Sequence, residues 1–129
     1  MKYIGIDYGT KRIGLAIGND SEYMAFPREV VETNKKSMEY IADYIKKEQV
    51  DAIVMGESLD LDGNKNPLMQ NIEKFVAEIG ALTGLSVYYE PEFFSSHQAQ
   101  HIQGKNDMLD ASSASIILGS FLNKLKNKK

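Results

Sequence analysis

The chain has 129 residues, of which 43% are hydrophobic and 26% charged, and its formal net charge at pH 7 is −3. These ordinary values predict a single globular domain over 1–129 and exclude global disorder. No run of about 18 apolar residues is present, and the absence of cysteine excludes disulfides and thiolate metal sites. A strand pattern begins at the second residue, so we expect no signal peptide, no membrane span and a cytoplasmic location.

The first third of the chain predicts three strands and a helix. Residues 2–8 and 12–19 are isoleucine-rich runs joined through the short turn "GTKR", which is typical of a β-hairpin. Residues 26–33 predict a third strand, entered through Pro27. Asn34 is expected to cap the helix that follows. The apolar residues of this helix recur at helical spacing, at Met38, Ile41, Ala42 and Ile45.

The middle of the chain predicts a buried strand and a second helix. Residues 50–56 are almost continuously apolar, as in a strand of a parallel sheet that is buried on both faces. Pro67 and Gly84 bracket the helix, because proline favours the start of a helix and glycine its end. The expected core face of this helix comprises Leu68, Ile72, Phe75, Val76, Ile79 and Leu82.

The last third predicts a fifth strand over 85–90, a short helix over 95–102 and a final helix over 108–125. The residues of the final helix that we expect to face inward are Ala111, Ala114, Leu118, Phe121, Leu122 and Leu125. The order β-β-β-α-β-α-β-α-α implies an α/β fold, with a mixed five-stranded sheet flanked by helices. Because residues 50–56 must pair beside the opening strand, we expect residues 2–8 at the centre of the sheet.

Acidic residues lie where the predicted strands end and where the last helix begins. They are Asp7, Glu57, Glu90, Glu92, Asp107 and Asp110. A buried carboxylate without a partner is very costly, so each of these acids needs solvent, a basic neighbour or a cation. Asp7 can lie at an exposed strand end beside Lys11 or Arg12. Asp107 can cap the last helix, with Asp110 near the positive end of the helix dipole.

The same acids can instead converge at one edge of the sheet. Clustered carboxylates repel one another unless cations neutralise them. Hard oxygen ligands suit Mg²⁺ or Mn²⁺, and two such ions can activate a water and stabilise the leaving oxygen in phosphodiester hydrolysis. The pattern therefore also indicates a metal-dependent site for cleaving phosphodiesters.

Basic residues gather in short clusters although the chain as a whole is acidic. The clusters are Lys11–Arg12, Lys35–Lys36, Lys46–Lys47 and the tail "KLKNKK". Local clusters matter more than the total charge for attracting a polyanion. Each of them is also typical of a solvated surface.

Other candidate sites are weaker. His97 and His101 are four residues apart, but no HExxH acid lies between them, which favours a surface pair. Residues 60–64, "DLDGN", resemble the start of a calcium loop but lack its length and its final glutamate, which predicts a turn. Neither GxxxxGK[ST] nor GxGxxG occurs, so nucleotide-loop folds have no support.

The opening motif "GIDYGTKRIGLAIG" resembles the signature of the YqgF family, ribonuclease H-like proteins described as Holliday junction resolvases or pre-16S rRNA nucleases. The segments "VMGESLDLDG", "PEFFSSHQA" and "LDASSASIILGSFL" are similar to the family's GLPLNMDG, DERLTT and DAAAA-type segments, in the same order. The resemblance covers the whole chain. It implies one ribonuclease H-like nuclease domain over 1–129.

This resemblance implies a set of catalytic acids. Asp7, Glu92 and Asp110 are the expected catalytic residues and the ligands of a two-ion Mg²⁺ or Mn²⁺ site. Glu57 and Asp107 are further candidate ligands, because some related resolvases carry acids at these places.

The resemblance also implies a phosphate-binding turn. Gly9 and Thr10 would let the backbone turn tightly beside the metals, while Lys11 and Arg12 would meet phosphate.

The chain departs from the family pattern near one of the acids. Pro91 stands where the family has aspartate, Phe93 where it has arginine, and Ser58 where it has proline. The missing arginine removes a bidentate phosphate clamp. A non-catalytic nucleic-acid-binding module with the same fold therefore stays open as an alternative.

These observations favour a metal-dependent endonuclease that acts on structured RNA, with 5′-end processing of pre-16S rRNA in ribosome biogenesis as the expected role. The alternative enzyme is a Holliday junction resolvase acting on branched DNA, which would need a dimer to cut two strands symmetrically. We expect a monomer or a weak homodimer whose partner is RNA or branched DNA. A phosphotransferase of the actin and sugar-kinase type has a D-x-G-T loop like "DYGT", but it needs two lobes and this chain has length for one.

Overall fold

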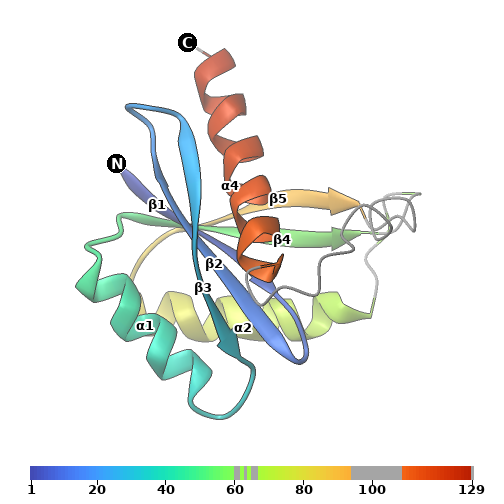
Figure 1. The fold of residues 1–129 in the computed structure, drawn as a ribbon. Helices are drawn as coiled ribbons and strands as arrows, with labels where there is room; N and C mark the ends of the chain where they lie inside the picture. Colours follow the sequence, from blue (N-terminus) through green and yellow to red (C-terminus); the bar gives the residue numbers. More distant parts are fainter. Residues whose placement is uncertain (60–61, 63, 65–66, 94–108, 129) are drawn as a thin grey trace.

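The computed structural model describes residues 1–59, 62, 64, 67–93 and 109–128, and for 92, 93, 109 and 110 it describes the backbone. Within these residues the order of elements is β-β-β-α-β-α-β-α (Figure 1). They are β1 Lys2–Tyr8, β2 Arg12–Asn19, β3 Met24–Glu32, α1 Ser37–Lys47, β4 Ala52–Leu59, α2 Leu68–Thr83, β5 Val87–Phe93 and α4 Leu109–Asn127. The short helix expected over 95–102 lies outside the described residues. No helix in the described part of the chain is long and apolar enough to cross a membrane.

The strands form one mixed sheet in the order β3-β2-β1-β4-β5, so the opening strand lies at its centre, as predicted. β1 pairs antiparallel with β2 and parallel with β4. β4 in turn pairs parallel with β5, and β2 pairs antiparallel with β3. Because β1, β4 and β5 run in the same direction, their carboxyl ends point to the same edge of the sheet.

Different helices cover the two faces of this sheet, with α1 and α2 on one side and α4 on the other (Figure 1). Side chains alternate between the faces along a strand. On β1, Ile4 and Ile6 pack in the core with α1 and α2, whereas Tyr3 packs in the core with α4. Because both faces are covered, β1 and β4 are apolar along most of their length, which explains the continuous apolar runs in the sequence.

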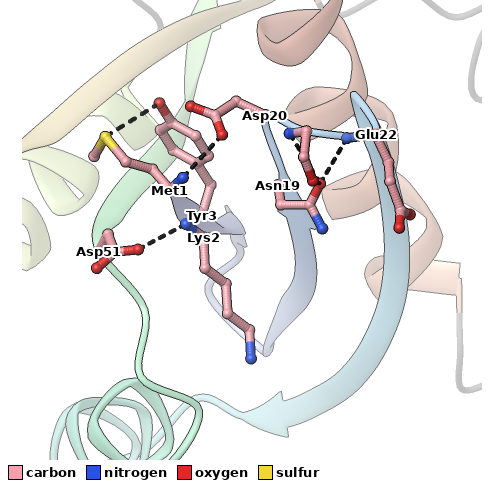
Figure 2. Close-up of polar contacts among 8 residues, drawn as sticks. Met1, Lys2, Tyr3, Asn19, Asp20, Glu22 and Asp51 are labelled. Carbon is pink, nitrogen blue, oxygen red and sulfur yellow. Dashed lines mark hydrogen bonds and ion pairs between the residues drawn. The ribbon is translucent and has the colours of Figure 1, made fainter.

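The amino-terminal end of β1 is held by polar contacts to the segments beside it (Figure 2). The Met1 ammonium donates a 2.8 Å hydrogen bond to Asp20 Oδ1, and the Lys2 backbone N–H donates one of 2.8 Å to Asp51 Oδ2. Asp7 lies near the other end of the strand. These contacts therefore stabilise the sheet at the end of β1 that lies away from Asp7.

Strand β3 differs from its prediction at its start. It begins at Met24 rather than at residue 26, and Pro27 lies inside it, paired in register with Ala16. Proline has no N–H to donate, so it is tolerated on an edge strand or at a bulge. Both conditions hold, because β3 is an edge strand and the register with β2 shifts between Leu15 and Ala16.

Strands β4 and β5 run further than predicted. β4 ends at Leu59 instead of residue 56, and β5 ends at Phe93 instead of residue 90. The two strands pair in continuous register up to their last residues. Polar residues can extend a strand when a neighbouring strand forms hydrogen bonds with their backbone N–H and C=O groups. The hydrophobic pattern of the sequence does not show this pairing.

The start of α1 corrects a predicted cap. The helix begins at Ser37 with Lys36 as its N-cap residue, so the cap predicted at Asn34 is wrong. Asn34 Oδ1 accepts a 2.8 Å hydrogen bond from the Lys36 backbone N–H, and Ser37 Oγ donates one of 2.7 Å to the Asn34 carbonyl. Asparagine often bonds to its own backbone in this way and so shapes a turn rather than a helix start.

Helix α2 confirms its predicted end but not all of its predicted core face. Gly84 ends the helix in the left-handed conformation with φ 70°. Leu82, which was expected in the core, is 61% exposed, while Met69 is 2% exposed and takes a core position. Leu82 lies in the last turn, where it lines an open cavity between α1 and α2 instead of facing the sheet.

Candidate active site

Asp7 is the next-to-last residue of the central strand. It pairs in register with Gly14 of β2 and is partly buried. Tyr3, four residues earlier on the same strand, packs in the core beneath α4. Strand alternation therefore places Asp7 on the face of the sheet that α4 covers.

Helix α4 lies directly against the middle of β1 because residue 5 is glycine. A Cβ built on Gly5 would lie 2.7 Å from the Leu118 Cβ and 2.9 Å from the Ala114 carbonyl oxygen. The second contact is to backbone, which cannot move aside without moving the helix. Glycine at this position therefore sets the distance between α4 and the strand that carries Asp7.

The direction of α4 brings its first turn to the Asp7 end of the sheet. Gly18, which pairs with Tyr3, lies close to Leu122, since a Cβ built on Gly18 would be 2.9 Å from the Leu122 Cδ1. Successive turns of α4 thus advance toward the amino-terminal end of β1. The backbone of Asp110, in the first turn, lies in the opposite direction, toward Asp7.

Strand β5 contributes to the same face. Tyr88 packs against Phe121 of α4 with ring centroids 5.5 Å apart, and Glu90 also contacts α4. Glu92 occupies the strand position two residues further and pairs in register with Ser58 of β4. Its backbone therefore lies at the carboxyl-end edge of the sheet, the edge to which Asp7 also belongs.

The structure places the two further candidate ligands differently. Glu57 lies inside β4, on the same alternation as Ile53 and Met55, which pack in the core with α1 and α2. This puts Glu57 on the face opposite to Asp7, so its placement lends no support to a role as metal ligand. Asp107 lies outside the described residues.

The turn between β1 and β2 is built on a glycine and is fastened to a second loop. A Cβ built on Gly9 would lie 2.6 Å from the Arg12 carbonyl oxygen, so the turn closes this tightly only with glycine. Thr33 Oγ1 donates a 2.8 Å hydrogen bond to the Gly9 carbonyl. Thr10, Lys11 and Arg12 are exposed. The turn can therefore present its cations to a ligand, and Thr33 is a supporting residue that the sequence analysis missed.

An ion pair between β5 and α4, in which only the carboxylate is buried, was also missed. Glu90 is 3% exposed, and its Oε2 accepts a 2.8 Å hydrogen bond from Ser120 Oγ and lies 2.7 Å from Lys124 Nζ. The signal in the sequence is Ser120 and Lys124 at i, i+4 on one helix face, opposite a strand acid. This contact joins the two elements that carry Glu92 and Asp110.

We expect loss of the Lys124 ammonium to destabilise the protein. Among the described residues, the buried Glu90 carboxylate would then keep Ser120 Oγ as its hydrogen-bond donor. Lys124→Met should lower the free energy of unfolding by about 1–2 kcal/mol, less than for a fully buried pair because the lysine side chain is 56% exposed. Glu90→Gln combined with Lys124→Met should recover part of this loss, because an amide is cheaper to bury than a carboxylate. Urea unfolding of both variants checks the result, and equal stability of the single and double variants would contradict it.

The donor chemistry at this edge fits a divalent cation. Asp7 offers hard carboxylate oxygens from a partly buried position, which suits Mg²⁺ or Mn²⁺ better than soft metals. Among the side chains that the structure describes, no group of three or more His, Cys, Asp or Glu residues could hold a metal ion. The side chains of Glu92 and Asp110 do not belong to that described set. His97 and His101 also lie outside the described residues.

Two solved Holliday junction resolvases have a fold similar to that of this chain. The chain superimposes on "T. thermophilus RuvC in complex with Holliday junction substrate" with a TM-score of 0.63 and 15% identity, covering 98% of this chain and 96% of that one. The fowlpox virus Holliday junction resolvase gives a TM-score of 0.60 at 17% identity, covering 96% and 99%. At this identity the likeness concerns the fold, which is ribonuclease H-like, as the motifs implied.

Sequence relatives cover nearly the whole chain. A "Putative pre-16S rRNA nuclease" of Nitratidesulfovibrio vulgaris is 35% identical over an alignment that covers 95% of this chain and 94% of that protein. A protein of the same name from Bordetella parapertussis is 32% identical over 124 residues, spanning 95% and 93%. Residues 1–124 match the RuvX family, described as "Holliday junction resolvase". The chain therefore belongs to the RuvX (YqgF) family, as its motifs predicted.

Proposed function

We propose that this nuclease is a divalent-metal-dependent endonuclease that cleaves structured RNA, with pre-16S rRNA as its substrate and 5′-end processing in ribosome biogenesis as its role. The observation that carries the proposal is the position of Asp7 on the α4-covered face of the central strand, at the sheet edge to which β4 and β5 also lead. The relatives at 32–35% identity bear the name of a pre-16S rRNA nuclease. We further propose that residues 1–129 act as one domain.

The proposed metal ligands are Asp7, Glu92 and Asp110. When bound, Mg²⁺ or Mn²⁺ would supply a nucleophilic water at neutral pH and stabilise the charge on the leaving oxygen. The three carboxylates would hold the cations and thereby relieve their own repulsion. Their backbones come from β1, β5 and the first turn of α4, and these elements are tied together by Gly5 and by the Glu90–Lys124 pair. We propose that this rigidity keeps the acids in place.

The turn between β1 and β2 would hold the substrate beside these acids. Lys11 and Arg12 are exposed, and their turn begins two residues after Asp7. A phosphate group one or two nucleotides from the scissile bond could therefore contact the turn while the bond lies at Asp7. Such contacts position the backbone and carry no sequence information.

The second candidate function is resolution of branched DNA. The family description and the two superimposed structures name Holliday junctions, which favours this reading. Symmetrical cutting of two strands would need a homodimer, whereas the RNA reading needs only a monomer or a weak homodimer. Pro91 and Phe93, which replace the family's aspartate and arginine, keep a third reading open, in which the chain binds nucleic acid without cutting it.

A cleavage assay with both substrates separates these functions. A fragment of precursor rRNA and a four-way DNA junction are incubated in parallel with the protein and Mg²⁺ or Mn²⁺, with EDTA as the control. The proposal expects metal-dependent cleavage of the RNA. Cleavage of the junction alone would support the resolvase, and binding of either substrate without cleavage would support the non-catalytic module.

Replacing Lys11 and Arg12 by alanine should weaken nucleic-acid binding uniformly. We expect the slope of log K against log[salt] to fall by roughly 0.7–0.9 for each lost phosphate contact, with equal losses for unrelated sequences. Binding is measured by fluorescence anisotropy at several salt concentrations, without metal. An unchanged salt slope would show that the turn is a solvated surface.

A further inference from the structure

We infer that the substrate-binding surface continues from the β1–β2 turn across the edge of the sheet to the α1–α2 side, where Lys35 and Lys74 form a second site for phosphates of the nucleic-acid backbone. This inference rests on the proposed function, since it extends the path of the same substrate. The motif resemblance assigned phosphate contacts only to the turn over residues 9–12.

The proposed site is a cavity of about 260 Å³ beside the carboxyl end of β1. Its polar lining comes from the β3–α1 loop and from α2. The lining residues that can contact a ligand through polar groups include Thr33, Asn34, Lys35, Asn71, Lys74 and Glu78. Lysine ammonium, asparagine amide and threonine hydroxyl groups are among the donors that bind phosphate oxygens.

The floor of this cavity is aromatic and adjoins the candidate active site. Tyr8 lines it and packs against Phe75, with ring centroids 5.3 Å apart. Tyr8 directly follows Asp7 in β1, so the two side chains point to opposite faces of one strand end. The cavity and Asp7 therefore lie on opposite faces of the sheet, at the same edge.

Two hydrogen bonds fasten the cavity to the turn that carries Lys11. Thr33 Oγ1 donates to the Gly9 carbonyl at 2.8 Å, and the Thr33 backbone N–H donates to the Lys11 carbonyl at 2.9 Å. Lys35 follows Thr33 by two residues and lines the cavity. The backbones that carry Lys11 and Lys35 are therefore joined, which keeps the two lysines on neighbouring loops.

The charge of the cavity lining favours an anion at this place and not further along the helices. Two lysines and one acid, Glu78, line the smaller cavity. The neighbouring cavity of about 910 Å³ between α1 and α2 is lined by Lys35 and Lys46 together with Glu39, Asp43 and Glu78. Acids outnumber lysines in the larger cavity, so we expect the nucleic acid to contact the smaller cavity and not to extend into the larger one.

The test compares two alanine variants in the full chain. Lys35→Ala combined with Lys74→Ala should weaken binding of labelled precursor RNA by roughly tenfold near 0.1 M salt and lower the salt slope by about 0.7–0.9 per contact. Lys46→Ala combined with Lys47→Ala is the matched control, because it removes two exposed lysines of α1, of which Lys46 lines the acidic cavity. Binding is measured by anisotropy in EDTA, so that cleavage does not interfere. Lys35→Arg combined with Lys74→Arg should restore the wild-type salt slope.

The outcomes distinguish this inference from the proposed function. If the wild type cleaves RNA but the Lys35–Lys74 double variant binds and responds to salt as the Lys46–Lys47 control does, the second phosphate site is wrong and the proposed function stands. If the Lys35–Lys74 double variant loses affinity but the wild type cleaves no RNA with any metal, the surface is right and the proposed function fails. Melting temperatures within a degree or two of the wild type exclude misfolding as the cause.

Discussion

Asp7→Asn is expected to abolish measurable cleavage, which means a fall in the cleavage rate of roughly 10³-fold or more, while the protein stays folded. The amide is nearly the same size as the carboxylate, so the packing of β1 should not change. The amide lacks the negative charge with which the Asp7 carboxylate would hold a divalent cation. The measurement is the rate of cleavage of the RNA fragment under single-turnover conditions, with circular dichroism to verify the fold. Asp43→Asn, at an exposed position on α1, is the matched control and should cleave at the wild-type rate.

The same variant should respond weakly to metal. Mg²⁺ or Mn²⁺ should raise the melting temperature of the wild type, because a ligand of the native state stabilises it. The shift should be much smaller in Asp7→Asn. In EDTA the variant should be as stable as the wild type or more so, because one source of repulsion between the clustered acids is gone. Equal metal-induced shifts in both proteins would show that Asp7 is not a ligand, and Asp7 would then be a strand end beside a basic turn.

Gly5→Ala should lower both stability and the cleavage rate, because the added methyl group would push α4 away from β1. The added Cβ would lie 2.9 Å from the Ala114 carbonyl oxygen and 2.7 Å from the Leu118 Cβ, so the helix must shift. Overpacking of this kind costs about 1–3 kcal/mol of unfolding free energy. A displacement of α4 by about 1 Å also moves the backbone of Asp110, and misplacement on that scale can lower a rate by about 10²-fold. Urea unfolding and single-turnover cleavage measure the two effects.

Gly119→Ala is the control for this prediction, because it adds the same methyl group to the same helix. A Cβ at residue 119 meets nothing within 4 Å, and alanine is the better helix former by about 1 kcal/mol. This variant should therefore be as stable as the wild type or more so, with normal cleavage. If Gly5→Ala behaves like Gly119→Ala, close packing at residue 5 does not govern the position of α4.

Local chemistry by itself determined most of the fold. The apolar runs at the start of the chain and over 50–56 predicted a central opening strand and a parallel neighbour, and the sheet order confirms both. Gly84 ends α2 as predicted, because its φ of 70° is available to glycine at little cost. The motifs around Asp7 and in the last helix also identified the family. Each of these signals depends on a few neighbouring residues, which is why they are visible in the sequence.

Only the tertiary structure decided how distant residues combine. That Glu57 falls on the opposite face from Asp7 depends on where β4 begins and ends, and the strand runs three residues beyond its apolar stretch. The contacts of Glu90 with α4 and of Thr33 with the β1–β2 turn join residues 34 and 24 positions apart. No local pattern specifies such partners, because the free energy of a contact depends on the geometry that all the elements adopt together. Lys35 and Lys74 are ordinary surface lysines in the sequence, and they share one cavity because the sheet packs α1 beside α2.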